Sequence, residues 1–329
     1  MFQKVGESVN SALGNETTEY HYTLVLDNKL WIFSRKYQGQ PMHNWGHRVA
    51  YIGGYAAYFD LTSRNWSRKM EFSALAEDEN MDELLFIVDG HIHLLLYNGF
   101  GGMKFISCFQ WDSENGKWHA IHFEVEEGIN FECEHPDEVC SLFVVDQENS
   151  RQRSVILASH FQNSVILHEL HVGGEDAKLK KLSNLNIEQM WKPVMGASWE
   201  NNVFLLFCAL GCGYRFQPDV ALQYNRNTGQ TQLIEIKGEK PPFCFSGSRH
   251  TALLASGKWI HAAGSVAFRQ NSRFTGEIWE LDLNNLQTWK KLPVEIQGMD
   301  SEELCIAINE DRKLYVFDRS SDVMAAALT

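Results

Sequence analysis

One order of strands recurs along this chain, and an internal period constrains the fold more strongly than any single motif. The clearest copy occupies residues 249–294, where the apolar segments HTALLAS, WIHAAG, EIWELDL and TWKKLPV follow one another with polar turns or loops between them. This order predicts a four-stranded antiparallel meander. Four further copies with the same order are found at approximately 22–70, 83–124, 140–182 and 195–237.

A polar residue marks the turn after the third strand of each copy. The markers are Asp60, Asp112, His171, Asn225 and Asp282, which lie 52, 59, 54 and 57 residues apart. Six residues separate the last large residue of the third strand from the first large residue of the fourth, as in Phe59 and Trp66 or Trp111 and Trp118. A regular period over five copies favours a ring or array of similar units over a sandwich that is built once.

This interval, with its Asp-containing turn and the Trp that opens the fourth strand, resembles the kelch repeat over essentially the whole chain. The resemblance is strongest at 249–294 and 83–123 and weakest at 140–182, where Ala177 or Leu179 replaces the Trp. The glycine pair that usually ends the second kelch strand is degraded here, for example to Ala263-Gly264. The resemblance implies an all-β protein, a β-propeller with one four-stranded antiparallel blade for each repeat.

The two ends of the chain supply a further blade. Residues 303–328 contain a hairpin and a third strand, and the segment 2–6 echoes the spacing of the fourth strand at Trp289. Pairing the ends would remove a free sheet edge. We therefore expect residues 1–329 to form a single six-bladed propeller, closed by N- and C-terminal strands. Five blades with a disordered tail is the alternative.

The composition limits the classes of partner and the cellular location that we expect for this protein. Lys+Arg total 29 against 42 Asp+Glu, a formal net charge of −13, so we expect no nucleic-acid partner. The longest apolar run, Val203 to Leu210, is far shorter than the ~20 residues of a membrane helix, so we expect no membrane association. Seven cysteines without framework spacing favour reduced thiols and a cytoplasmic location, with the nucleus as the alternative.

Catalytic motifs are missing from the sequence. It contains no phosphate loop, no dinucleotide-binding glycine fingerprint, no Gly-x-Ser-x-Gly and no His-Glu-x-x-His. The pair Cys208 and Cys212 lacks a second pair at zinc spacing, and His91 and His93 would share one strand face, which is more typical of packed than of metal-binding histidines. We therefore expect no enzyme, no cofactor and no metal.

The loops between second and third strands carry a distinctive charge. They contain seven Lys or Arg residues and no Asp or Glu, while acidic residues gather in the connections between blades, such as Glu71–Glu83. Arginine grips carboxylates in a bidentate fork and aromatic rings provide rigid contact area, so these loops have the composition of a binding surface. The predicted partner-binding residues are Arg35, Tyr37, Trp45, Arg48, Phe100, Lys104, Tyr214, Arg215, Phe216, Phe268, Arg269, Arg273 and Phe274.

Two functions from different classes fit this surface. The first is a non-catalytic protein-interaction module, a scaffold or adaptor that binds an acidic peptide or protein surface. The kelch resemblance implies membership of a ubiquitin-ligase or cytoskeletal complex, although residues 1–21 are too short for the BTB or F-box segment of a ligase receptor. The alternative is a small-molecule-binding or enzymatic propeller with its site at the channel mouth. RNA binding through the same loops is a third and minor option.

Overall fold

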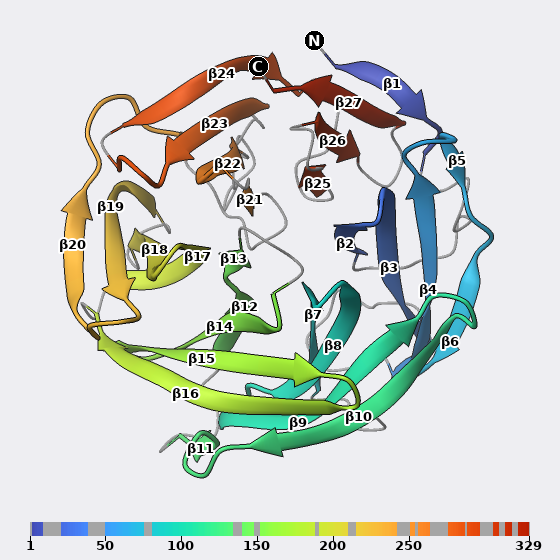
Figure 1. The fold of residues 1–329 in the computed structure, drawn as a ribbon, viewed down its shortest axis with the longest axis horizontal. Coiled ribbons are helices and arrows are strands. Elements are labelled where there is room, and N and C mark those ends of the chain that lie inside the picture. Colours follow the sequence, from blue (N-terminus) through green and yellow to red (C-terminus); the bar gives the residue numbers. More distant parts are fainter. Residues whose placement is uncertain are drawn as a thin grey trace.

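The computed structural model consists of strands arranged in a ring of sheets (Figure 1). It describes residues 2–8, 21–38, 50–75, 81–133, 140–147, 152–187, 191–209, 215–241, 251–253, 256–263, 276–286, 288–296, 305–308, 313–317 and 322–328. Within these ranges there is no helix, and hence no helix able to cross a membrane.

Four of the five sheets are built around an antiparallel meander that runs outward from the centre of the ring to its rim (Figure 1). In one of them a short additional strand pairs in parallel at the inner edge. The first sheet contains β2 (His21–Leu26), β3 (Lys29–Gln38), β4 (Ala50–Asp60), β5 (Asn65–Trp66) and β6 (Met70–Ser73). Another contains β13 (Asp146–Gln147), β17 (Trp191–Trp199), β18 (Asn202–Ala209), β19 (Arg215–Asn225) and β20 (Thr231–Glu235). The next contains β21 (Thr251–Leu253), β22 (Lys258–Ala263), β23 (Glu277–Asp282) and β24 (Trp289–Glu295).

The expectation of six separate blades is wrong. The described strands form four such blades and one nine-stranded sheet, which spans the ranges of the second and third expected blades. The large sheet contains β7 (Asp82–Val88), β8 (His91–Asn98), β9 (Gly102–Asp112), β10 (Lys117–Val125), β11 (Phe131–Glu132), β12 (Ser141–Val144), β14 (Ser154–Phe161), β15 (Ser164–Gly173) and β16 (Asp176–Asn186).

The length of β10 explains this join. Strand β10 pairs with β9 only from Lys117 to Ile121, so its last residues extend beyond that partner. Exposed strand edges readily pair with other strands, because their backbone groups lack hydrogen-bond partners. Here β16 runs parallel to the overhang, from the pair His122 and Asp176 to the pair Val125 and Leu179.

The remaining blade combines both ends of the chain, as the sequence predicted. Its strands are β25 (Cys305–Ile308), β26 (Lys313–Phe317), β27 (Val323–Ala327) and β1 (Gln3–Gly6). Strand β1 is antiparallel to β27, with Gln3 opposite Ala325. The backbone oxygen of Glu7 then accepts a hydrogen bond from Trp66 Nε1 at 3.0 Å, so the N-terminal strand contacts the next blade in the ring as well.

The repeated turns use one hydrogen-bond pattern. At four of the five markers, all except His171, the side chain accepts backbone N–H groups two or three residues later, which fixes a tight turn. Asp60 Oδ1 accepts from Thr62 and Ser63 at 2.9 and 2.7 Å, and Asp112 Oδ1 accepts from Glu114 and Asn115 at 2.9 and 3.1 Å. Asn225 and Asp282 make equivalent contacts.

The turns bring the large residues of the sequence interval face to face. Phe59 lies opposite Trp66 with ring centroids 5.2 Å apart, and Trp111 lies opposite Trp118 at 5.0 Å. Such cross-strand aromatic pairs stabilise a sheet. The core is distributed between neighbouring meanders rather than gathered at one centre: Phe59 packs with Tyr315 and Phe317, and Trp111 packs with Trp31 and Phe33.

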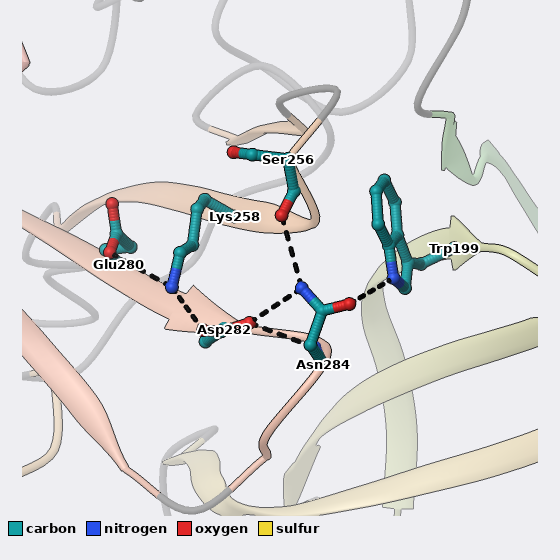
Figure 2. Close-up of polar contacts among 6 residues, drawn as sticks. All are labelled: Trp199, Ser256, Lys258, Glu280, Asp282 and Asn284. Atoms are coloured by element: carbon teal, nitrogen blue, oxygen red, sulfur yellow. Dashed lines mark hydrogen bonds and ion pairs between the residues drawn. The ribbon is translucent and has the colours of Figure 1, made fainter.

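A polar network connects two adjacent blades at the β23–β24 turn (Figure 2). Asn284 donates to the Ser256 backbone oxygen at 3.2 Å and accepts from Trp199 Nε1 of the neighbouring blade at 3.0 Å. Asp282 orients the Asn284 amide and also forms an ion pair with Lys258. The Asn284 side chain therefore forms hydrogen bonds both to a turn of its own blade and to an indole of the neighbouring blade.

Replacing Gly6 with valine is expected to lower the free energy of unfolding by about 2 kcal/mol, the usual cost of overpacking a core. A Cβ atom at Gly6 would lie 2.4 Å from two ring carbons of Phe59, which is buried. Urea unfolding followed by tryptophan fluorescence measures the change. Gly173→Val is the matched control, because no described atom lies within 4 Å of a Cβ there. Equal losses in both variants would contradict close packing at the N-terminal strand.

Candidate binding face

The hairpin between β8 and β9 presents an aromatic ring to solvent. Phe100 at its tip is 54% exposed. Lys104, which is also exposed, lies in the returning strand β9 opposite Asn98. The Phe100 N–H donates to Asn98 Oδ1 at 2.8 Å, which fixes the backbone at the tip. Among the described residues, no carboxylate lies within ion-pair distance of Lys104.

Neighbouring backbone holds this hairpin on both sides. The Gly99 oxygen accepts the Cys140 N–H at 2.7 Å, and the Gly101 oxygen accepts the Cys133 N–H at 2.9 Å. Gly102 has φ 143°, and a Cβ there would lie 2.2 Å from the Phe131 backbone oxygen, so only glycine permits this approach. The Phe100 ring therefore projects from a firmly anchored loop.

Arg35 lies near the same edge of the ring, but its charge is already paired. Its Nε donates to Glu83 Oε2 at 2.9 Å, and the two side chains are only 15% and 6% exposed. Glu83 faces Leu96 in the β7–β8 pair, two residues before the hairpin begins at Asn98. Arg35 itself belongs to β3, which extends to Gln38, rather than to the loop that the sequence predicted.

Lys36 is also paired. Its Nζ donates to Glu71 Oε1 at 2.9 Å and lies 5.2 Å from the Tyr55 ring centroid. Hydrogen bonding to Tyr55, followed by that to Glu71, raises the pKa of Lys36. The expected separation of basic loops from acidic connections therefore fails at Arg35 and Lys36, because Glu83 and Glu71 from the connections reach both cations.

The structure gives no side-chain positions for the other predicted partner-binding residues. The backbones of Tyr37, Arg215 and Phe216 lie in β3 and β19, and their side chains fall outside the described part. The remaining predicted residues lie outside the described ranges altogether; they are Trp45, Arg48, Tyr214, Phe268, Arg269, Arg273 and Phe274. Their role in binding stays a prediction.

A small gap lies beside the Arg35–Glu83 pair, between the first blade and the nine-stranded sheet. Its lining includes Ser34, Phe72 and Trp118, and it has room for about one water molecule. Ser34 Oγ and Trp118 Nε1 are buried there without a hydrogen-bond partner in the described part of the chain. The gap therefore suits a single bridging water rather than a substrate.

Two histidines are buried in neutral form. Desolvation lowers the pKa of His93 to about 4 and that of His168 to about 3. His168 Nε2 lies 2.8 Å from Ser159 Oγ, and the His93 ring stacks on Phe86 at 5.7 Å. His91, exposed on the same strand as His93, lies 6.4 Å away between ring centroids. No group of three possible metal ligands occurs among the residues with described positions.

Sequence reasoning missed a contact between two cysteines beside the tip of the hairpin. The Sγ atoms of Cys133 and Cys140 are 3.8 Å apart. Their spacing in the sequence was read as irregular, and the one available clue was that both flank a short polar segment just before a strand. The pairing of Arg35 with Glu83 was also missed, because 48 residues separate the two.

The sequence matches no known family model, and no curated protein matches it either. Solved structures do share its architecture. The Dos1 propeller is 9% identical with a TM-score of 0.42, over 92% of this chain and 75% of that one. A polysaccharide lyase, an ulvan lyase, is 9% identical with a TM-score of 0.48, over 96% and 81%. A putative 6-phosphogluconolactonase from Bacteroides uniformis is 10% identical with a TM-score of 0.44, over 87% and 74%.

These comparisons correct one expectation from the sequence. Two of the three similar structures carry the names of enzymes, so the prediction that this chain is not an enzyme is withdrawn. A β-propeller supports many unrelated functions, and its architecture gives no reason to exclude catalysis. The ring of sheets shows the fold directly: the chain is an all-β, propeller-like protein.

Proposed function

We propose that this protein is a protein-interaction module that contacts its partner through the β8–β9 hairpin. The observation that carries the proposal is the exposure of Phe100, which is 54% exposed on an anchored loop. A rigid aromatic ring loses little conformational entropy on binding, and rings of this kind dominate many protein interfaces.

Lys104 defines the chemistry of the partner. It is exposed on the strand that leaves the hairpin tip, and an acidic side chain of the partner would complement it. Arg35 and Lys36 contribute less, because Glu83 and Glu71 already neutralise them. The partner segment we propose therefore combines an apolar residue that covers Phe100 with a carboxylate that faces Lys104.

The kelch assignment forms part of this proposal. The recurrent Asx turns at Asp60, Asp112 and Asp282 and the aromatic pair of Trp111 and Trp118 support a degenerate kelch repeat. Interaction through loops on one face would agree with that assignment. The proposed partner complex is cytoplasmic.

Phe100→Ala is expected to weaken partner binding by about 2 kcal/mol, roughly 30-fold in Kd, the size of an interface hot spot. The chain offers a matched control, because Leu233 on β20 is 55% exposed but lies on a different blade. A tagged wild-type protein, Phe100→Ala and Leu233→Ala would each be used for capture from a cytosolic extract, and Kd would be measured on the purified partner.

A partner that Phe100→Ala loses and Leu233→Ala retains supports the hairpin interface, provided that both variants unfold at the same temperature. Equal binding by all three proteins contradicts it. Replacing Lys104 with Glu should weaken the same complex further and reduce its dependence on salt, since an opposite-charge contact is removed.

A small-molecule-binding or enzymatic propeller with its site at the channel mouth is the second candidate. The enzyme names of two similar structures favour it. This function predicts that a metal ion, chromophore or metabolite copurifies with the protein. Elemental analysis and mass spectrometry would detect it. That outcome, together with an empty protein capture, would replace the interaction module.

A further inference from the structure

Two thiols meet beside the tip of the β8–β9 hairpin. Cys133 directly follows β11, and Cys140 directly precedes β12. Their Sγ atoms are 3.8 Å apart, which is van der Waals contact between two reduced sulfur atoms. Cys140 is buried and Cys133 is half-buried, so one thiol of the pair is open to a reagent from solvent.

The backbone fixes the positions of the two cysteines. Their N–H groups donate to Gly101 and Gly99, two residues apart on a single hairpin. Each cysteine is therefore anchored to the same short segment. A disulfide requires its sulfur atoms to be about 2.05 Å apart, so bond formation from this geometry needs small rotations of the side chains.

We propose that Cys133 and Cys140 are a redox modification site, which forms a reversible disulfide when the protein meets a hydroperoxide. The Cys133 thiol loses its proton, the thiolate attacks a peroxide oxygen and the O–O bond breaks. The departing hydroxide takes up the proton, so a sulfenic acid and a first water result. The Cys140 sulfur then attacks the Cys133 sulfur, the S–O bond breaks, and a second water leaves. Two thiols lose two electrons in total, and one hydrogen peroxide gains them.

Cys108 provides an internal reference. It is fully buried in β9, and desolvation raises its pKa to about 12. Because the thiolate is the reactive form, a buried thiol of this kind resists oxidation. A peroxide in solution can therefore reach Cys133, whereas burial protects Cys108 from it.

The disulfide would close residues 133–140 into a covalent ring. The backbone of both cysteines supports the hairpin tip, so the bond would fix that tip more firmly in place. This inference does not depend on the proposed function, because the bond can be detected in the isolated protein whether or not a partner binds at Phe100.

The test treats the full-length protein with hydrogen peroxide, blocks the remaining thiols with N-ethylmaleimide and maps the peptides by mass spectrometry. We expect a linked peptide that joins Cys133 to Cys140, about 2 Da lighter than the two reduced peptides together, and lost on addition of dithiothreitol. Cys108→Ala should form the same link. Cys140→Ser should instead leave Cys133 as a sulfenic acid that dimedone traps.

Cys133→Ser provides a second variant in case the substitution of the buried Cys140 unfolds the protein, and it should also abolish the link. Peroxide treatment in concentrated urea tests whether the link forms because the fold holds the two thiols together or only because they are close in the sequence. Slower link formation in urea supports positioning by the fold. Equal rates in urea and buffer, or oxidation of other cysteines while both Cys133 and Cys140 retain maleimide, would overturn the inference.

Discussion

Acidification from about pH 7.5 to about pH 5 is expected to lower the free energy of unfolding by about 4 kcal/mol through two histidines alone. His93 and His168 have folded pKa values of about 4 and about 3, against 6.5 for the free side chain, because burial disfavours the charged form. Their stabilising contribution is complete above pH 6.5. Below it, the unfolded chain binds protons that the folded chain excludes, at about 1.4 kcal/mol per pH unit for each histidine.

Desolvation sets the sign of the pKa shift at both histidines, although their polar neighbours act in different directions. Lys181 lowers the pKa of His168 in addition to desolvation. At His93, the backbone hydrogen bond to His91 and the charge of Asp89 act in the opposite direction but do not offset desolvation. The loss should continue until the pH passes through the folded pKa values and then level off.

Urea unfolding at several pH values, followed by tryptophan fluorescence, measures the effect. The double variant His93→Gln with His168→Gln should show a much flatter dependence between pH 7 and 5, whatever its stability at neutral pH. His91→Gln is the comparison variant, because that side chain is exposed and its charge affects the pKa of His93 less than desolvation does. A double variant with the wild-type slope would show that other groups carry the acid sensitivity.

The turn aspartates titrate in a separate range. Hydrogen bonding to Asn115 holds the pKa of Asp112 at about 2, and backbone hydrogen bonds lower that of Asp60. A carboxylate with a lowered folded pKa contributes stability that is lost only below its ordinary value of 3.8. The turn aspartates therefore do not contribute to a loss of stability between pH 7 and 5.

Apart from the pairing of the two chain ends, the parts of the fold that the sequence predicted are local. The pairing of Phe59 with Trp66 depends on a turn of a few residues, and the polar residue that forms the turn is visible in the chain at Asp60. In the blade with the longer turn, Leu281 rather than Asp282 faces Trp289, because the extra residue extends the turn and leaves the cross-strand pairing intact.

The parts that the sequence did not predict depend on distant strands. Whether β10 ends with β9 or continues beside β16 depends on the relative lengths of three strands, and no pattern within one repeat contains that information. The charge of the loops was misjudged for the same reason. A list of loop residues shows Arg35 and Lys36 without acids, while the fold brings Glu83 and Glu71 to them from other strands.

Replacing Arg35 with alanine is therefore expected to act on stability, at a cost of about 3 kcal/mol, rather than on binding alone. The Arg35–Glu83 pair is nearly buried, with side chains 15% and 6% exposed. Removing the guanidinium leaves a desolvated carboxylate with its main counter-charge gone. Removing both charges avoids this penalty, so Arg35→Leu with Glu83→Leu should be more stable than Arg35→Ala.

Urea unfolding of both variants, with Lys36→Ala as the reference, decides between a structural and a recognition role. The Lys36–Glu71 pair is the same type of contact at 2.9 Å, but it lies at the surface, so its loss should change stability little. If Arg35→Ala unfolds like the wild type yet loses the partner that Phe100→Ala loses, Arg35 belongs to the binding face after all. If stability falls and the double-leucine variant restores it, the arginine joins the first blade to the nine-stranded sheet, and recognition on this edge of the ring rests with Phe100 and Lys104.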